Sequence, residues 1–267
     1  MEKTAARSGW LWVKQGFALF RKQPAEMSTL FLAYMFLMLA LGILPLLGQV
    51  LPILLVPVFS MAFMQACANI EQGRKVYPTL LLTGFRTPAF RRLLLLGTLY
   101  ILAAVLAVAA SSLVDGGEFW QVMSGGRGVD EETVRNSNMS TAMMFAALAY
   151  APAAMAFWHA APLIVWHKMG VGKAVFYSFF AVKRAGGAFI VYGLAWILIG
   201  VILPAIVTSL VAMLFSRSLV VMVVLLPLSL VLTVVMYCSF YPTYTHVFGK
   251  PYADGTPEPG GFDAFGQ

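Results

Sequence analysis

Charged residues are scarce in this chain. Asp, Glu, Lys and Arg make up 11% of the 267 residues, and apolar residues make up 60%, whereas about 25% of a typical soluble domain is charged. No Asp, Glu, Lys or Arg occurs between Glu26 and Glu71. This scarcity excludes a soluble globular protein and leaves no room for a soluble catalytic domain. The composition therefore predicts an integral membrane protein with one membrane domain.

Cysteine is also scarce, and the residue patterns of common enzymes are missing. Cys67 and Cys238 are the only cysteines, and their spacing is neither that of a metal site nor that of a disulfide framework. The three histidines lack the neighbouring carboxylates that a metal centre would need. The chain has no GxSxG, no HExxH and no phosphate-binding glycine loop. We therefore expect no enzymatic activity, no metal and no cofactor.

Long apolar runs are what the chain has in abundance. A helix needs about 20 apolar residues to cross the hydrocarbon of a bilayer, and six runs are long enough. The interval without charges is about twice that length, so we expect two helices there, joined at a turn around Gly48, Gln49 and Pro52. The sequence thus predicts an all-α integral membrane protein with six transmembrane helices. The expected spans are 27–47, 51–70, 93–114, 141–166, 188–212 and 219–241.

Lysine and arginine are distributed unevenly between the two ends of these spans. Of the 18 basic residues, only Arg127, Arg135 and Arg217 fall on the side that holds the long loop between the third and fourth spans. By the positive-inside rule, both termini are then cytoplasmic. The net charge of +7 is explained by this topology and by attraction to anionic lipid. We expect anionic membrane lipids as partners, and no nucleic acid.

Three basic segments on the cytoplasmic side are too short to cross a bilayer. They lie at 8–22, 76–90 and 171–184, and each reads as an amphipathic helix lying in the membrane interface. In the first segment most aromatic side chains gather on one half of the helix and most basic side chains on the other. The candidate interface residues are Trp10, Trp12, Lys14, Phe17, Phe20, Arg21, Phe85 and Arg86.

Each of these segments precedes a pair of spans, which suggests an internal repeat. Three units, each an interfacial helix followed by two spans, would make up the membrane domain at 1–248. The alternative is that an aromatic residue, a base and a helix breaker simply mark any cytoplasmic membrane border. The remaining residues, 249–267, are rich in Gly, Pro and acidic residues, so we expect a disordered cytoplasmic tail.

The opening with Trp10, Gly16, Phe20 and Pro24, the stretch TGFRTPAFRR at 83–92, and the six spans resemble a broad group of uncharacterised bacterial inner-membrane proteins. That group is similar to the membrane domain found beside some glycerophosphodiester phosphodiesterases. The resemblance covers most of the chain, up to about Phe248, and implies a six-helix fold in the inner membrane. It transfers no catalytic residue, because the Glu, Asp and His cluster of the phosphodiesterases has no counterpart here.

Four polar residues within the spans are candidates for an interior site. Gln65 and Asn69 in the second span and Tyr150 and His159 in the fourth could line a cavity, or could hydrogen-bond across packed helices. For His159, next to a break expected at Pro162, we favour a hydrogen bond to a neighbouring helix or to a carbonyl freed by the break.

The fourth span also carries alanines four residues apart on several faces, so we expect it to lie at the centre of the bundle. For the whole chain, we expect a non-enzymatic membrane protein that organises or regulates envelope lipids or partner proteins. The alternative is a transporter or exporter of a small or amphipathic solute.

Overall fold

The chain folds as an all-α protein with six apolar helices long enough to cross a membrane, as predicted. The structure is a computed structural model of the whole chain, and it describes residues 5–45, 47, 48, 50–124, 138–213 and 221–251. Within these ranges there is no β-strand. The six candidate spans are Pro24–Gly42, Leu51–Glu71, Phe90–Asp115, Met139–Val165, Gly186–Val211 and Val223–Phe248.

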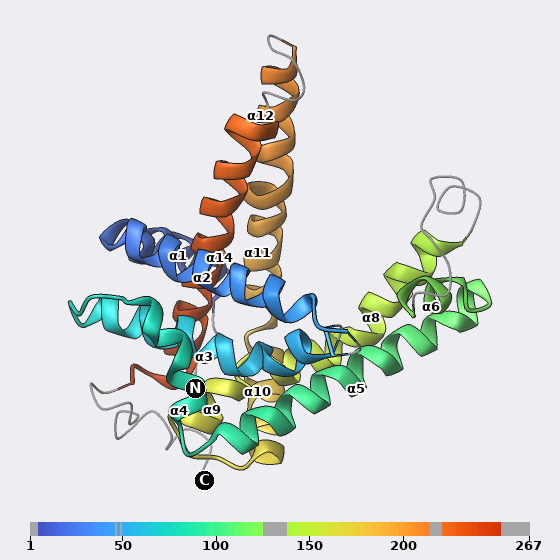
Figure 1. Cartoon of the computed structure of the whole chain (residues 1–267), viewed down its shortest axis with the longest axis horizontal. Coiled ribbons are helices and arrows are strands. Elements are labelled where there is room, and N and C mark those ends of the chain that lie inside the picture. The colour runs from blue at the N-terminus through green and yellow to red at the C-terminus, as the bar shows by residue number, and fades with distance from the viewer. Residues whose placement is uncertain (1–4, 46, 49, 125–137, 214–220, 252–267) are drawn as a thin grey trace.

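The spans pair into three helical hairpins (Figure 1). The first pairs α2 (Pro24–Gly42) with α3 (Leu51–Glu71), and the second pairs α5 (Phe90–Asp115) with α8 (Met139–Phe157). The third pairs α11 (Gly186–Ile197) and α12 (Leu203–Ala212) with α14 (Leu226–Phe248). The second and third hairpins diverge from a common base, so that their far ends lie well apart in Figure 1.

A short helical element precedes each hairpin along the chain. These elements are α1 (Arg7–Lys22), a 3-10 helix η1 (Pro78–Leu82) continued by α4 (Thr83–Arg86), and α10 (Val171–Arg184). The second segment therefore forms two short pieces instead of the one helix expected at 76–90. The order of elements is that of the proposed repeat, and the repeat itself stays a prediction. One further helix, α6 (Glu118–Met123), follows α5 on the way to α8.

The core is built around α3, which is the most buried of the six spans. It packs against α2, α5 and α14 and against the short helix α9 (Ala160–Val165). A Cβ atom at Gly97 of α5 would overlap the carbonyl oxygen of Leu54, so glycine permits this close approach of α5 to α3. The alanine-rich α8 is mostly exposed, and the prediction that it lies at the centre was wrong. Its packing is mainly against α5 and α10, because its hairpin diverges from the rest.

The last three spans are interrupted near prolines, and the interruption at Pro162 was expected from the sequence. Proline has no N–H to donate and its ring clashes with the carbonyl four residues earlier, so it weakens a helix and often breaks it, although Pro57, Pro152 and Pro242 lie inside α3, α8 and α14. The fourth span breaks between α8 and α9, just before Pro162. The fifth and sixth spans contain π-helical turns, η2 (Leu198–Ile202) and η3 (Val221–Leu225), immediately before Pro204 and Pro227.

Several span boundaries also differ from the sequence-based ones. The first span begins at Pro24 and not at 27, because proline is favoured in the first turn of a helix. It ends at Gly42 and not at 47. The last span continues to Phe248, past the expected end at 241, since Pro242 is accommodated within α14. The predicted disordered tail lies outside the described residues except for 249–251, as does most of the loop after α6.

Candidate functional site

The helix α1 lies across the third hairpin and is docked to it by its apolar face (Figure 1). Gly9 and Gly16 are two turns apart and meet the neighbouring backbones. A Cβ atom at Gly9 would overlap the carbonyl oxygen of Ala188 in α11, and one at Gly16 would lie 2.6 Å from the Cβ of Ser239 in α14. Contact this close needs glycine at both positions.

Trp12 is the anchor of this contact and does not face lipid. Its side chain is fully buried, with its ring centroid 5.1 Å from that of Phe189 and 5.7 Å from that of His246. The sequence-based reading placed Trp10 and Trp12 on the same lipid-facing half of α1. That placement was wrong for Trp12, because the apolar half of α1 is covered by protein.

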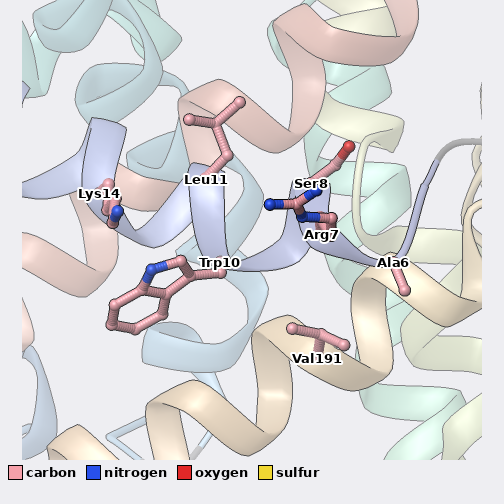
Figure 2. Close-up of a pocket in the computed structure, with 7 residues that line it drawn as sticks. All are labelled: Ala6, Arg7, Ser8, Trp10, Leu11, Lys14 and Val191. Carbon is pink, nitrogen blue, oxygen red and sulfur yellow. The ribbon is translucent and has the colours of Figure 1, made fainter.

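The opposite side of α1 forms an open depression against α11, with a volume of about 550 Å³ (Figure 2). Arg7 and Lys14 supply two exposed cations, and the Nζ atom of Lys14 lies 5.7 Å from the centroid of the Trp10 ring. Leu11 and Val191 provide apolar surface beside them, and none of the described lining residues carries a carboxylate. The lining residues are Ala6, Arg7, Ser8, Trp10, Leu11, Lys14 and Val191.

The other predicted interface residues are divided between surface and core. Arg21 and Arg86 are exposed. Phe17 stacks on Trp196 of α11 with ring centroids 6.5 Å apart, and Phe20 packs against the main core, so both serve the docking of α1. Phe85 is 37% exposed and also contacts the ring of Phe59 in α3.

A second candidate site is built around the break in the fourth span. His159 cannot make its helical hydrogen bond to Met155, because the Oγ of Ser178 in α10 inserts between the two groups. That hydroxyl accepts from the His159 backbone N–H at 2.9 Å and donates to the Met155 carbonyl at 3.0 Å. The phenol of Tyr100 in α5 donates to the Phe157 carbonyl at 3.3 Å. Neighbouring helices thus satisfy the backbone that the break exposes.

An interior cavity of about 270 Å³ opens beside this break. Side chains of α3, α5, α8, α9 and α14 enclose it, and most are aromatic or aliphatic. His159 and Tyr150 both line it, which is one of the two roles expected for them from the sequence. The other lining residues are Val56, Ser60, Phe63, Met64, Tyr100, Ala154, Phe157, Trp158, Ala161, Pro162, Tyr237 and Phe240.

His159 is buried and connects the break to α14. Its Nε2 lies 3.2 Å from the Oγ1 of Thr243, and the same oxygen accepts from the Nε1 of Trp158 at 3.2 Å. This is a hydrogen bond to a neighbouring helix, of the kind the sequence favoured. The Nδ1 atom of His159 is buried and has no hydrogen-bond partner within the described residues.

Gln65 and Asn69 lie outside the cavity lining. The amide of Gln65 donates to the Oδ1 of Asn69 at 3.1 Å, and its Oε1 lies 3.4 Å from the Nε1 of Trp166. Gln65 therefore connects α3 to the end of the fourth span, whereas the hydrogen bond of the Asn69 side chain stays within α3.

Outside the spans, His167 has a perturbed ionisation. Its Nε2 lies 2.8 Å from the phenol oxygen of Tyr244, and burial lowers the pKa of the imidazole to about 4. His167 is therefore neutral at physiological pH. In the described part of the chain, no three His, Cys, Asp or Glu side chains are grouped so that they could hold a metal ion.

Sequence reasoning did not identify Ser178, Thr243 or Val191. Ser178 is the one small hydroxyl residue between aromatic residues in "VFYSFFAV", and this was the available signal that α10 inserts a polar group into a neighbour. Nothing in the local sequence links Thr243 to His159, which lies 84 residues away.

Comparison with known proteins identifies a close match in length and sequence. A probable inner membrane protein of Burkholderia thailandensis is 37% identical over 252 residues, which cover 92% of this chain and 93% of that protein. No family model matches the chain, and no solved structure gives a significant match. With its six apolar helices, the chain is a multi-pass membrane protein that belongs to the same inner-membrane protein family as this Burkholderia relative.

Proposed function

We propose that this protein is a non-enzymatic organiser of the inner membrane that binds anionic lipid through the depression beside α1. The observation that carries the proposal is the pairing of two cations, Arg7 and Lys14, with the apolar surface of Leu11 and Val191 (Figure 2). The cations attract a lipid phosphate, and the apolar surface accommodates the first part of the acyl chains. Trp10 has the amphipathic ring that is favoured at the depth of the headgroups.

The proposal includes an orientation with both termini in the cytoplasm. The docked α1 would then lie at the inner leaflet, where anionic lipids create a negative surface potential. Exposed Arg21 and Arg86 lie in the elements that precede the first and second hairpins and would add to the attraction. The resemblance to the membrane domain found beside some glycerophosphodiester phosphodiesterases would fit this role, since this chain would then correspond to the membrane part without the enzyme.

The test is lipid binding by the purified protein in detergent. Native mass spectrometry would compare phosphatidylglycerol with phosphatidylcholine for the wild type and for the double variant R7Q/K14Q. We expect the wild type to prefer phosphatidylglycerol and the variant to lose that preference by a factor of about 30, because each of the two cations contributes about 1 kcal/mol near a membrane surface.

The matched control is R127Q/R135Q, which removes the same charge from the loop assigned to the outer side. The control should keep the preference for phosphatidylglycerol. Equal losses in the two double variants would show that net charge, and not the depression, attracts the lipid. That result would contradict the proposal.

The alternative function, transport or export of a small amphipathic solute, is favoured by the interior cavity beside His159. Cysteines placed at Tyr150 and Ala154 would report access to this cavity, since both residues line it. Labelling of both by a membrane-impermeant maleimide, from one side in one state and from the other side in another, would support transport. Complete protection would count against it.

A further inference from the structure

We infer that a second pocket beside α1 is a binding site for a phosphate group that carries one negative charge, as in a phosphodiester. The pocket has a volume of about 220 Å³ and lies between the C-terminal half of α1, the end of α3 and α14. No described residue lines both this pocket and the depression between α1 and α11. The inference therefore does not depend on lipid binding in that depression.

One face of α1 supplies a cation and apolar surface to the pocket. Four lining residues recur at the spacing that places side chains on one face of a helix, and they are Gln15, Ala18, Leu19 and Lys22. Lys22 is exposed, and within the part of the chain that the structure describes it forms no ion pair. Its ammonium is carried on a flexible stem of four carbons, so it can reach a phosphate in so small a pocket.

The opposite wall of the pocket positions a second cation. Tyr241 is 2% exposed, and its phenol donates to the Oε2 of Glu71 at 2.8 Å. The other carboxylate oxygen, Oε1, lies 2.8 Å from the Nζ of Lys250. This ion pair uses one of the three N–H donors of the Lys250 ammonium, which leaves two for a ligand. Both oxygens of Glu71 already have partners, and Lys250 balances its charge.

The charges of the lining determine the charge of the ligand. Among the described lining residues, Lys22 and Lys250 outnumber the single carboxylate of Glu71, so one positive charge is left unbalanced. A phosphodiester carries one negative charge and accepts hydrogen bonds from both ammonium groups. A phosphomonoester carries about 1.5–2 negative charges near pH 7, and its additional charge would meet the carboxylate of Glu71, which is unfavourable.

Size and position limit the ligand further. The volume is below the range of typical small-molecule sites, so the pocket suits a headgroup or a small ester and not a whole lipid. Lys22 ends α1, Glu71 ends α3, and Lys250 follows α14 by two residues. The pocket thus lies at the ends of two spans, where the phosphodiester of a lipid headgroup and a soluble phosphodiester are both accessible.

The experiment measures how fast each lysine is acetylated in the full-length protein in detergent micelles, by mass spectrometry. Phosphatidylglycerol in the micelle and dimethyl phosphate in the buffer supply the phosphodiester, and diacylglycerol and trimethyl phosphate are their uncharged controls. We expect phosphatidylglycerol at about twice its Kd to slow acetylation of Lys22 and Lys250 about threefold, and the uncharged controls to have no effect. Phosphatidic acid, a phosphomonoester, should protect less.

The two phosphodiesters distinguish the two sources of the ligand. Protection of Lys22 and Lys250 by dimethyl phosphate as well would assign the pocket to a soluble ester. Protection by phosphatidylglycerol alone would assign it to a lipid headgroup. Lys173 of α10 is exposed and lies outside the lining, so it reports any general effect of charge on the micelle.

Two variants test the roles of the charged residues. In Lys22→Gln, half-maximal protection of Lys250 should need about fivefold more phosphatidylglycerol, because one cation is lost. The matched control Lys75→Gln removes the same charge from an exposed position after α3, outside the lining, and should leave this protection unchanged. Glu71→Gln keeps an acceptor for Tyr241 and should abolish the preference for phosphatidylglycerol over phosphatidic acid.

Three outcomes would overturn the inference. The first is equal slowing at Lys22 and at Lys173 in the wild type. The second is protection by phosphatidic acid that equals or exceeds protection by phosphatidylglycerol. The third is undiminished protection of Lys250 in folded Lys22→Gln. The wild-type comparisons decide even where a variant does not fold. The double variant R7Q/K14Q tests the other site and should keep the protection of Lys22 and Lys250, so the two proposals can fail separately.

Discussion

At the scale of single residues, the break in the fourth span shows how this protein manages polar groups in an apolar interior. Pro162 ends α8, and a helix end inside a membrane protein must find partners for its free backbone groups. Those partners come from other helices: Ser178 from α10 and Tyr100 from α5. Hydrogen bonds at the break therefore connect the fourth span to α10 and to α5.

Ser178→Ala tests the contribution of the hydrogen bonds at this break. The substitution leaves the backbone N–H of His159 and the carbonyl of Met155 without their present partner in a buried place. We expect a loss of about 1–3 kcal/mol in the free energy of unfolding, seen as a lower thermal midpoint in detergent. Ser209→Ala is the matched control, because the Ser209 hydroxyl is exposed and bonds only within its own helix. An equal effect of the two substitutions would contradict the role of Ser178.

His167 predicts a pH dependence of stability. The folded protein holds the imidazole neutral down to about pH 4, whereas in the unfolded chain the pKa returns to about 6.5. Between these values the unfolded state binds more protons, so stability falls as the pH drops from 6.5 to 4. After allowance for partial exposure, we expect about 1 kcal/mol.

Thermal midpoints measured at pH 7 and pH 4.5 would check this dependence. His167→Gln keeps a polar side chain that can bond to Tyr244 but does not titrate, so its midpoint should change less between the two pH values. A variant as pH-sensitive as the wild type would assign the effect to other groups.

At the scale of elements, the pattern of residue types in α1 predicts an amphipathic helix but does not show what covers its apolar face. Its amphipathic character was visible in the sequence, and the helix lies at Arg7–Lys22, one residue longer than expected. What covers the apolar face was not visible, because bilayer and protein are both apolar and favour the same side chains. Only the glycines distinguish them: Gly9 and Gly16 have no use at a lipid surface, but they permit backbone contact with α11 and α14.

Gly16→Ala should therefore weaken the docking of α1. The new methyl group would lie 2.6 Å from the Cβ of Ser239, and we expect a destabilisation of about 1–3 kcal/mol together with faster proteolysis of α1. Gly193→Ala is the control, because this helical glycine of α11 has no neighbour within 4 Å of an added Cβ. There alanine should stabilise by about 0.5–1 kcal/mol. Unchanged protease resistance in Gly16→Ala would show that α1 is held by lipid instead.

For the other elements too, the pattern of residue types predicted the helices but not how they pack against one another. Existence and number of the spans follow from the length of apolar runs, so all six were found. The relative burial of the spans could not be predicted from the lengths of the apolar runs. Alanines four apart in α8 permit close packing, but they do not require it, and the packed centre is α3, whose large side chains Phe59 and Phe63 fill the core. Of the candidate cavity residues, His159 and Tyr150 were identified from polarity within a span, and their lining partners depend on contacts between distant helices.

At the scale of the whole molecule, hydrogen bonds tie the segments that connect the hairpins. The side chain of Gln23, between α1 and α2, bonds to the backbone of Arg74 and Val76 after α3. Arg92, at the start of α5, donates to the carbonyls of Lys168 and Met169 before α10. The carboxylate of Glu71 at the end of α3 pairs with Lys250 after α14, with 2.8 Å between Nζ and Oε1. These ties connect the starts and ends of the hairpins that the sequence assigns to one side of the membrane.

These hydrogen bonds and this ion pair predict the topology of the chain. Because both ends of each hairpin lie at these contacts, both ends of the chain should lie on one side, and the concentration of Lys and Arg in the connecting segments predicts that this side is cytoplasmic. Green fluorescent protein fused after Gln267 should fluoresce, and alkaline phosphatase fused there should be inactive. Alkaline phosphatase inserted at Gly128, in the loop after α6, should be active. Active phosphatase after Gln267 would mean an odd number of crossings or an inverted protein, and the cations beside α1 would then face the leaflet that the lipid-binding proposal does not allow.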